Sequence, residues 1–290
     1  MFTDNPVTPI RLEILIETLR AYPHGLARKE VCRLLQPEPL SPDLASGSPV
    51  VVTVKAALEL GLAEESERKL SLTAACRKTK DTRAAILEAF DEKVLSSADV
   101  EKYFSLFYAY YLGLGKRVYQ RRTRANQQWA DQFNLDVFAN EPQENPFNAT
   151  KMTGLHRWFS YAGLGWYDPS DELPIRCFQA NPYDRIKRAF PAIFGRQRKL
   201  DADDFMNKLA TSCPELDGGK IFLQANPEWD AAQKQCTLGL SHALVELHLD
   251  GAIRLNCPAD SAGWSVAEAE QPGGPDFRSA RIATVELLHS

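Results

Sequence analysis

The order of apolar and turn-forming residues from Arg11 to Thr73 constrains the fold more than any other feature of the chain. Apolar residues recur at helical spacing in three segments. The first ends before Pro23, the second runs from Leu26 to the residue before Pro37, and the third covers residues 50–60. Two short strands, 62–65 and 69–73, follow around a turn at residues 66–68. Three helices and a hairpin in this order predict a winged helix-turn-helix.

The order of a helix, a glycine and a hairpin recurs twice more along the chain. The second helix of this kind ends at Gly163, and strands are expected from Trp166 and over residues 173–180. The third contains four leucines and ends at Asp250-Gly251; the leucines are Leu240, Leu244, Leu247 and Leu249. A strand at residues 252–255 should follow, with residues 263–266 as its possible partner. We therefore predict winged-helix-like modules at these places too.

Helices dominate the rest of the chain. An aromatic-rich helix over residues 99–115 reads as a core helix, with an aromatic binding platform as the alternative. Further helices are expected at 82–95, 183–194 and 201–213, and strands at 221–223 and 280–288. The predicted fold class is mainly α with short β-hairpins (α+β), in which tandem winged-helix-like modules are joined by a helical middle. The predicted domains are 1–80, an N-terminal winged helix; 81–182, a helical region with a second winged-helix-like unit; and 183–290, a C-terminal winged-helix-like module.

Composition is typical of a globular protein, with 44% hydrophobic and 25% charged residues among 290. No apolar run reaches the ~20 residues of a membrane span, and the first residues do not read as a secretory signal. We therefore expect a cytoplasmic protein. The six cysteines lack CxxC spacing, which favours reduced thiols over disulfides or zinc. A net charge of -4 argues against wholesale coating of nucleic acid, but leaves room for a local basic patch.

The clearest electrostatic feature is a basic segment at residues 116–124, which has five positive charges and no acid. These are Lys116, Arg117, Arg121, Arg122 and Arg124. Lys and Arg neutralise phosphate charge and release counterions, so this segment is the first candidate for contact with a nucleic-acid backbone. The alternative is a solvated helix face whose cations pair with acids from elsewhere.

The predicted modules offer fewer basic residues. Lys55 lies on the third helix of the first module, and Arg68 and Lys69 lie on its wing. Lys151 and Arg157 lie on the helix of the second module. We predict nucleic-acid contacts at these five positions, although so few basic residues make base-specific reading doubtful. A second basic cluster runs from Arg185 to Lys199, and pairing with the acids at 201–204 explains it equally well.

Catalytic signals are weak. Asp201, Asp203 and Asp204 directly precede or begin a predicted helix, where acids favour the helix dipole. His242 and His248 are six residues apart, whereas a helical zinc pair needs a spacing of four. The glycines at 218–219 lack the surrounding phosphate-loop pattern. We therefore expect no catalytic residues, no metal site, no cofactor and no small-molecule ligand. A metal-dependent nuclease using the three aspartates remains the most distant alternative.

The layout that begins with RLEILIETLR and LARKEVCRLL, with helical and winged-helix-like regions behind it, resembles the multi-winged-helix accessory proteins of bacterial phage-defence and DNA-modification gene clusters. Among these it is most similar to the DpdG family of the 7-deazaguanine DNA-modification system. This resemblance implies a role beside DNA-modifying or DNA-restricting enzymes. We expect a non-catalytic DNA-binding or adaptor protein with DNA and protein partners. The alternatives are a protein-interaction subunit that docks partner enzymes, and a transcriptional regulator.

Overall fold

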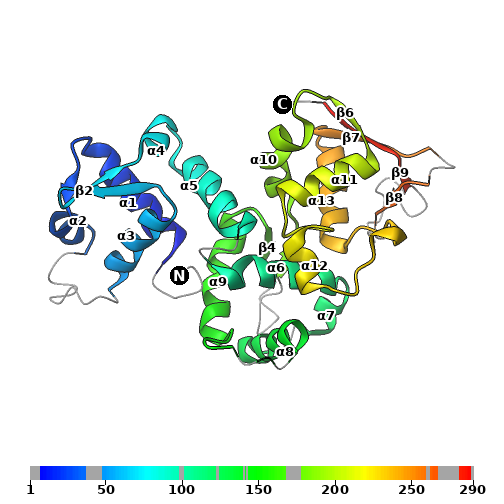
Figure 1. Cartoon of the computed structure of the whole chain (residues 1–290), viewed down its shortest axis with the longest axis horizontal. Coiled ribbons are helices and arrows are strands. Elements are labelled where there is room, and N and C mark those ends of the chain that lie inside the picture. Colours follow the sequence, from blue (N-terminus) through cyan, green and yellow to red (C-terminus); the bar gives the residue numbers. More distant parts are fainter. Residues whose placement is uncertain are drawn as a thin grey trace. The chain divides into compact units, whose positions relative to one another are not determined.

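The computed structural model describes residues 7–36, 48–97, 101–121, 124–139, 141, 143–167, 178–258, 262–266 and 281–288. The chain is mostly helical with short antiparallel strand pairs, which confirms the predicted α+β class (Figure 1). It forms two compact units. Unit 1 contains residues 1–104 and 148–161, and unit 2 contains residues 105–147 and 162–290. Among the residues that the structure describes, none of the helices has the length and apolar character that crossing a membrane requires.

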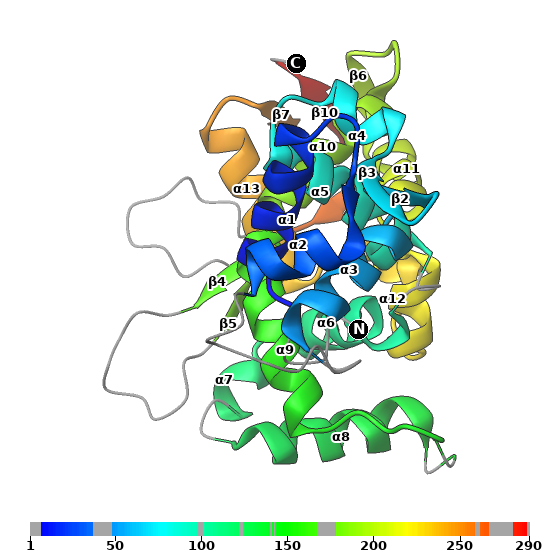
Figure 2. The same cartoon turned by 90° about the vertical axis from the view of Figure 1, so that its left-hand side faces the viewer.

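Unit 1 begins with three helices and a three-stranded sheet, which Figures 1 and 2 show grouped together. We call residues 9–72 the first motif. Its elements are α1 (Pro9–Ala21), β1 (Leu26–Ala27), α2 (Arg28–Leu35), α3 (Pro49–Glu59), β2 (Ala63–Ser66) and β3 (Lys69–Leu72). The strands are antiparallel and lie in the order β1-β3-β2. The predicted three helices and hairpin are all present.

The glycines of the first motif explain its turns. Gly61 has a φ of +69° and ends α3, and the N–H of Leu62 then donates to the carbonyl of Ala57 at 2.9 Å. Glu67 and Arg68 both have positive φ and form the two-residue turn between β2 and β3. The prediction that the second helix starts at Leu26 was wrong by two residues. Leu26 is in a strand because Gly25, with a φ of +75°, brings the chain beside Leu70.

The remainder of unit 1 is helical. Its elements are α4 (Ala74–Lys78), α5 (Thr82–Phe90), a π-helix (Asp91–Ser96) and α9 (Ala149–Tyr161). The helix α4 is short, and the Thr73 hydroxyl caps its start by accepting from the N–H of Cys76. The core between α5 and α9 is aromatic. Phe90 stacks on Trp158 with ring centroids 5.0 Å apart, and the Trp158 indole donates to the Val7 carbonyl at 3.2 Å.

Unit 2 is built around α6 (Lys102–Leu114), whose residues from Ser105 onward belong to this unit. Its Phe107, Tyr108, Tyr110 and Tyr111 are all buried, so the predicted core helix is confirmed. α7 (Arg117–Arg121) and α8 (Asn126–Phe138) follow, and a two-stranded sheet pairs β4 (Gly165–Tyr167) with β5 (Phe178–Ala180). The helix of the second predicted module, α9, belongs to unit 1, whereas its hairpin belongs to unit 2. The predicted strand residues 173–177 lie outside the described chain.

Unit 2 ends in a second motif, residues 183–287, which repeats the element order of the first but has an extra helix and 3-10 turn before its last helix and an extra strand pair before its last strand. Its elements are α10 (Tyr183–Phe194), β6 (Lys199–Asp201), α11 (Ala202–Ser212), α12 (Lys220–Ala225), a 3-10 turn (Ala231–Gln233), α13 (Leu238–Leu249), β7 (Ile253–Asn256), β8 (Trp264–Ser265), β9 (Arg281–Ile282) and β10 (Thr284–Leu287). The main sheet has the order β6-β10-β7. It matches the order β1-β3-β2 of the first motif, because in both sheets the last strand lies between the other two. Gly251 ends α13 as Gly61 ends α3, and Ala252 donates to the Leu247 carbonyl at 2.9 Å.

Two predictions about the second motif were wrong. The strand β7 pairs with β10, whereas residues 264–265, the expected partner, pair with β9. Residues 221–223 lie in helix α12 and not in a strand, because the N–H groups of Ile221 and Phe222 both turn back to the Pro214 carbonyl. Of the four predicted leucines on α13, three are buried and Leu249 is 54% exposed. The predicted terminal strand over residues 280–288 corresponds to β9 and β10.

Candidate nucleic-acid interface

The basic segment starts where α6 ends. Gly115 has a φ of +50° and turns the chain into α7, and the buried Val118 anchors α7 to the core of unit 2. Lys116 and Arg117 are exposed. The Arg117 guanidinium donates to the carbonyls of Gly113 and Leu114, both at 3.3 Å, and so lies against the C-terminal end of α6. A cation is favourable there because the end of a helix carries partial negative charge.

Arg121 has a different environment, since its side chain is only 17% exposed. Its guanidinium donates to the Tyr110 hydroxyl at 2.9 Å and lies 3.8 Å from the Asp136 carboxylate. The Tyr110 hydroxyl in turn donates to Asp136 at 2.7 Å. Burial, together with this hydrogen bond, raises the pKa of Tyr110. Arg121 thus belongs to a network that joins α6, α7 and α8, and its charge is largely compensated.

The other cations of the basic segment lack such compensation. Arg124 is half-buried, and Arg122 lies outside the described residues. Within the part of the chain that the structure describes, Lys116, Arg117 and Arg124 pair with no carboxylate. The alternative interpretation, a basic face neutralised by nearby acids, therefore fits Arg121 but not these three.

A polar pocket of about 470 Å³ lies on the side of α7 that carries Arg117 and Arg121. Tyr110 from α6 and Asp136 from α8 also line it, and residues 225–229 form its opposite wall. This wall was not singled out from the sequence. Its only sequence signal is the helix stop at Asn226-Pro227, because the contacts that bring it to α6 span more than a hundred residues.

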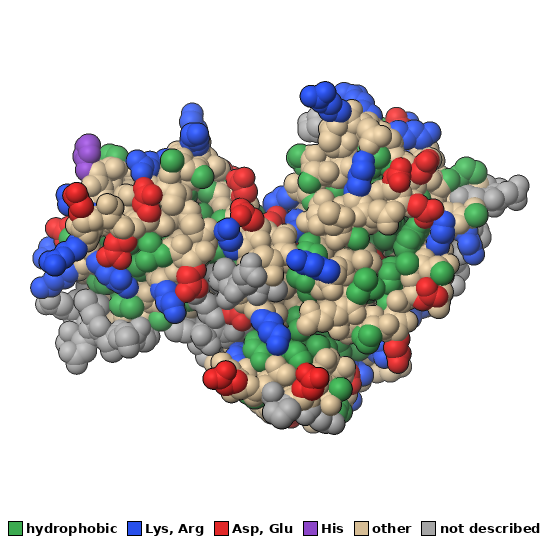
Figure 3. All heavy atoms as spheres, viewed as in Figure 1, with side chains coloured by type: hydrophobic (Ala, Val, Ile, Leu, Met, Phe, Trp, Pro, Cys, Tyr) green, Lys and Arg blue, Asp and Glu red, His purple; other side chains and the backbone are tan. Residues whose placement is uncertain are grey.

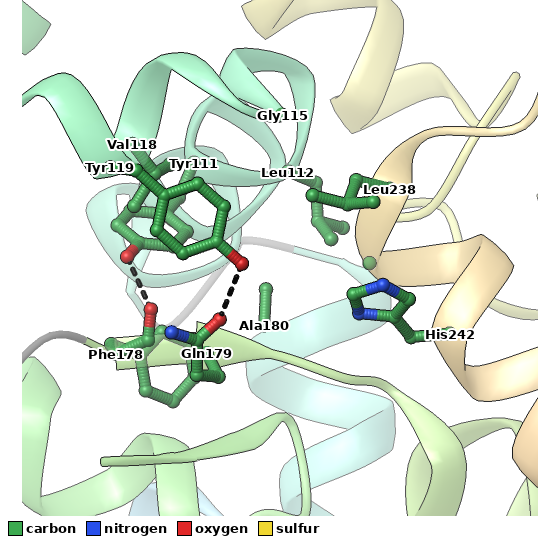
Figure 4. A pocket seen from close by; sticks show the side chains of 11 residues that line it. Tyr111, Leu112, Gly115, Val118, Tyr119, Phe178, Gln179, Ala180, Leu238 and His242 are labelled. Carbon is green, nitrogen blue, oxygen red and sulfur yellow. Dashed lines mark hydrogen bonds between the residues drawn. The ribbon is translucent and has the colours of Figure 1, made fainter. Parts of the chain in front are cut away.

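A much smaller pocket, about 20 Å³, lies on the other face of α7 (Figure 4). The Tyr119 hydroxyl donates to the Gln179 side chain at 3.0 Å, and the Tyr111 hydroxyl donates to the Phe178 carbonyl. Figure 4 shows the His242 imidazole facing this space from α13. Burial lowers the pKa of His242, which favours the neutral imidazole. The space suits one water molecule, so these contacts fix α7 on the core of unit 2.

The predicted contacts in the first motif lie on its surface. Lys55 is exposed on α3 but pairs with Glu59 at 3.6 Å. Arg68 and Lys69 are exposed at the tip of the β2–β3 hairpin. They form no ion pair with a carboxylate within the described ranges. The hairpin is therefore the more available of the two basic surfaces of this motif.

The two predicted contacts on α9 differ from each other. Lys151 is only 5% exposed, and its ammonium lies 4.9 Å from the centre of the Tyr103 ring. Such a buried cation–π contact is a structural role, so Lys151 is unsuited to a phosphate contact. Arg157, by contrast, is exposed. Nearby His156 is largely desolvated, which lowers its pKa to about 4 and keeps it neutral near pH 7.

The second basic cluster is divided by the fold. Arg185 is buried and bonds Glu215 at 2.8 Å, and Arg188 donates to the Ala162 carbonyl at 2.8 Å. Pairing with the acids at 201–204 was therefore wrong for Arg185. Lys187 is exposed on α10 and donates to the Tyr183 hydroxyl at 3.4 Å. Three further cations, Arg196, Arg198 and Lys199, are exposed where α10 leads into β6. Lys and Arg side chains gather at this end of unit 2 (Figure 3).

The residues considered for catalysis have structural partners. Asp203 accepts from Lys234 and from the Trp264 indole, both at 2.7 Å, and these hydrogen bonds lower the pKa of Asp203. His248 accepts from the N–H of Leu255 at 3.3 Å. No group of three or more His, Cys, Asp or Glu side chains within the described ranges is arranged to hold a metal ion. Five of the cysteines are free thiols, and Cys177 lies outside the described residues.

A family model described as DpdG-like matches residues 2–261, which is most of the chain. None of the curated proteins matches. None of the solved structures matches.

Proposed function

The chain belongs to the DpdG-like family, and we propose that it is a non-catalytic DNA-binding or adaptor protein of a bacterial DNA-modification and phage-defence system. The family connects the chain to a DNA-modification system. The observation that carries the proposal is the basic segment at residues 116–124, where Lys116, Arg117 and Arg124 pair with no carboxylate among the described residues, in a chain of net charge -4. These residues would contact the phosphate backbone and would not read bases.

The two motifs support this proposal through their topology. Both contain a helix, a strand, two further helices and two antiparallel strands in this order, with α12, β8 and β9 as additions in the second motif, and in both the last strand lies in the middle of the sheet. We propose that both are winged helices, a module that commonly places its third helix in the major groove of DNA.

In the second motif the helix that corresponds to α3 is α13, and it is not available for this purpose. Gly239 of α13 lies so close to the rest of unit 2 that an added Cβ would be 2.5 Å from the Leu112 side chain and 3.0 Å from the Ala180 carbonyl. In the first motif, α3 offers only the ion-paired Lys55 as a basic residue. Base-specific reading, and hence a transcriptional regulator, has little support, whereas phosphate contact needs only positive charge.

The proposal predicts a salt-dependent affinity for duplex DNA that falls when three charges are removed. We would measure binding of a random duplex by fluorescence anisotropy between about 50 and 200 mM salt. The variant Lys116→Gln/Arg117→Gln/Arg124→Gln should reduce the slope of log K against log salt by about 0.9 for each phosphate that is no longer neutralised. Circular dichroism would verify that the variant is folded.

A matched control removes the same charge elsewhere in unit 2. The variant Arg196→Gln/Arg198→Gln/Lys199→Gln also neutralises three exposed cations. Its slope should stay close to that of the unaltered protein. An equal decrease of slope in the two variants would mean that net charge, and not the basic segment, determines binding. Absence of binding at the lowest salt would refute the proposed function.

A second candidate function, protein docking, is favoured by the outer face of α3. Beside the Lys55–Glu59 pair this face carries partly exposed Val51, Val52 and Leu58. An apolar face on a helix suits a protein partner better than a DNA groove. Pull-down from the native host at high salt tests it, because a partner held by apolar contact should persist and should no longer be captured by the variant Val52→Asp.

A further inference from the structure

We propose that the pocket beside α7 binds a single nucleotide, with its phosphate at Arg117 and its base against Trp229. This inference deepens the proposed function and rests on it, because the same arginine serves as a phosphate contact. The pocket lies entirely within unit 2 and measures about 470 Å³. That volume is within the range of small-molecule sites, which is about 300 to 1,000 Å³.

The far wall of the pocket is held firmly against α6. The Asn226 side chain donates to the Ala109 carbonyl at 2.9 Å and to the Phe222 carbonyl at 3.1 Å. It lies so close to Gly113 that an added Cβ there would be 1.7 Å from its Oδ1 atom. Residues 227–229, which follow directly, are therefore fixed relative to Arg117. A site that is already formed loses little entropy when it binds a ligand.

An aromatic ring on this wall is held in place by two neighbours. Trp229 packs edge-on against Phe222, with centroids 5.5 Å apart, and stacks on Trp264 at 6.2 Å with an interplanar angle of 19°. Trp229 nevertheless lines the pocket. A fixed indole is a good platform for a base, since stacking of a base on an aromatic side chain contributes about 1 to 3 kcal/mol.

The charges in the pocket show which ligand would fit. Arg121 and Asp136 compensate each other. Two lining charges remain without an opposite partner among the described residues: the guanidinium of Arg117 and the carboxylate of the exposed Glu228. The pocket therefore has one positive and one negative group beside a flat ring. A nucleotide has matching parts, because its phosphate is an anion and the exocyclic amino group of its base is a hydrogen-bond donor.

The position of Glu228 should make the pocket prefer some bases over others. Cytosine, adenine and guanine carry an exocyclic amino group that can donate to a carboxylate, whereas uracil and thymine present carbonyl oxygens instead. A carbonyl oxygen facing Glu228 would leave both acceptors without a donor. We therefore expect the pocket to bind cytidine 5′-monophosphate about ten times more tightly than uridine 5′-monophosphate, which corresponds to one charge-assisted hydrogen bond.

Isothermal titration of the full chain with these two mononucleotides tests the inference. Glu228→Ala should remove the preference for the cytidine nucleotide, because it removes the acceptor from an exposed position. Arg117→Gln should weaken both nucleotides about tenfold, yet leave cytidine, which has no phosphate, unchanged. Glu144→Ala, which removes an exposed acid outside the pocket, is the matched control. It should keep both affinities.

The source of the nucleotide is distinguished by repeating the titration with single strands of dC and dT. A preference for the dC strand that Glu228→Ala abolishes would assign the pocket to an unpaired nucleotide of a strand. The same preference seen only with mononucleotides would assign it to a free nucleotide. Equal affinity for the cytidine and uridine nucleotides, or no saturable binding up to about 1 mM, would overturn the inference.

Failure of the pocket is distinguishable from failure of the proposed function. Glu228→Ala removes a negative charge, so it should leave duplex affinity unchanged or slightly higher. Duplex binding together with no nucleotide binding would overturn the pocket alone. Nucleotide binding with the predicted preference, in a protein that binds no duplex, would refute the proposed function while supporting the pocket.

Discussion

Replacing Arg185 by Met should lower the free energy of unfolding by about 3 to 5 kcal/mol, the largest effect that we expect from a single substitution. Arg185 and Glu215 form an ion pair at 2.8 Å, and their side chains are only 4% and 0% exposed. The Arg185 guanidinium also donates to the Ser212 carbonyl at 3.0 Å. Without the arginine, the Glu215 carboxylate would remain buried and would lose this ion pair. Urea denaturation of the full chain measures the change.

Two further variants separate the buried charge from other causes. The pair Arg254–Glu286, at 3.2 Å in the same unit, has side chains that are 53% and 34% exposed. Arg254→Met should therefore cost no more than about 1 kcal/mol. The double variant Arg185→Met/Glu215→Leu removes both buried charges and should recover much of the stability. A cost for Arg185→Met as small as that for Arg254→Met would contradict this account of the buried pair.

Local sequence patterns were sufficient for most helices, and the reason is visible in α1 and α10. Both have apolar residues at helical spacing and a clear stop, so their predicted positions agree with the structure within two residues. Elements fixed by distant partners were not predictable in this way. β1 has only two residues, and its pairing with β3 depends on the conformation of Gly25. The short apolar run in α12 looked like a strand, and only its return to Pro214 shows that it is helical.

The similarity of the two motifs was partly visible in the sequence. The common signal was an apolar helix followed by glycine, which α3 and α13 share. The partner of β7 could not be inferred, because β10 begins 28 residues after β7 ends. Hairpin rules favour the nearest candidate strand, and here residues 264–265 pair with β9 instead.

For the candidate interface, the sequence predicted where the cations lie but not which of them are paired. The run of cations at 116–124 is plain in the sequence, yet nothing there distinguishes Arg121 from Arg117. Their difference comes from Asp136, which lies on the next helix. Lys151 was a reasonable prediction by residue type, but burial beside Tyr103 changes its role. The wall that contains Glu228 and Trp229 joins α6 only through the tertiary contacts of Asn226.

The pH dependence of stability should show a second large effect, from Asp217. This carboxylate is fully buried and accepts from the N–H of Thr237 at 2.6 Å and from its hydroxyl at 2.8 Å. Burial raises the pKa of Asp217 from 3.8 to about 6, although both hydrogen bonds oppose the rise. Between these two values the folded chain binds a proton that the unfolded chain has released. The free energy of unfolding should therefore fall as the pH rises from 4 to above 6, by about 3 kcal/mol.

Asp217→Asn cannot ionise, so it should lack this fall. The amide has one acceptor oxygen in place of two, so it loses one of the two hydrogen bonds from Thr237, but that cost does not change with pH. Urea denaturation at intervals from about pH 4 to 7.5 would measure the difference in stability between the two proteins. Relative to the unaltered protein, the variant should gain about 3 kcal/mol as the pH rises through this range. A difference that stays constant would show that Asp217 does not titrate in this range.

Asp203 offers a control of opposite sign. Hydrogen bonds from Lys234 and Trp264 lower its pKa, so its contribution to stability is present above the unfolded pKa and is lost as the pH falls through the folded pKa. Asp203→Asn should therefore lose stability relative to the unaltered protein as the pH rises towards about 4, so its denaturation series must begin below pH 4. Asp217→Asn should instead gain stability between about pH 4 and 6. Because both carboxylates lie in unit 2, opposite trends could not come from a general effect of pH on that unit. The two trends would arise from the burial of Asp217 and from the pairing of Asp203 with Lys234.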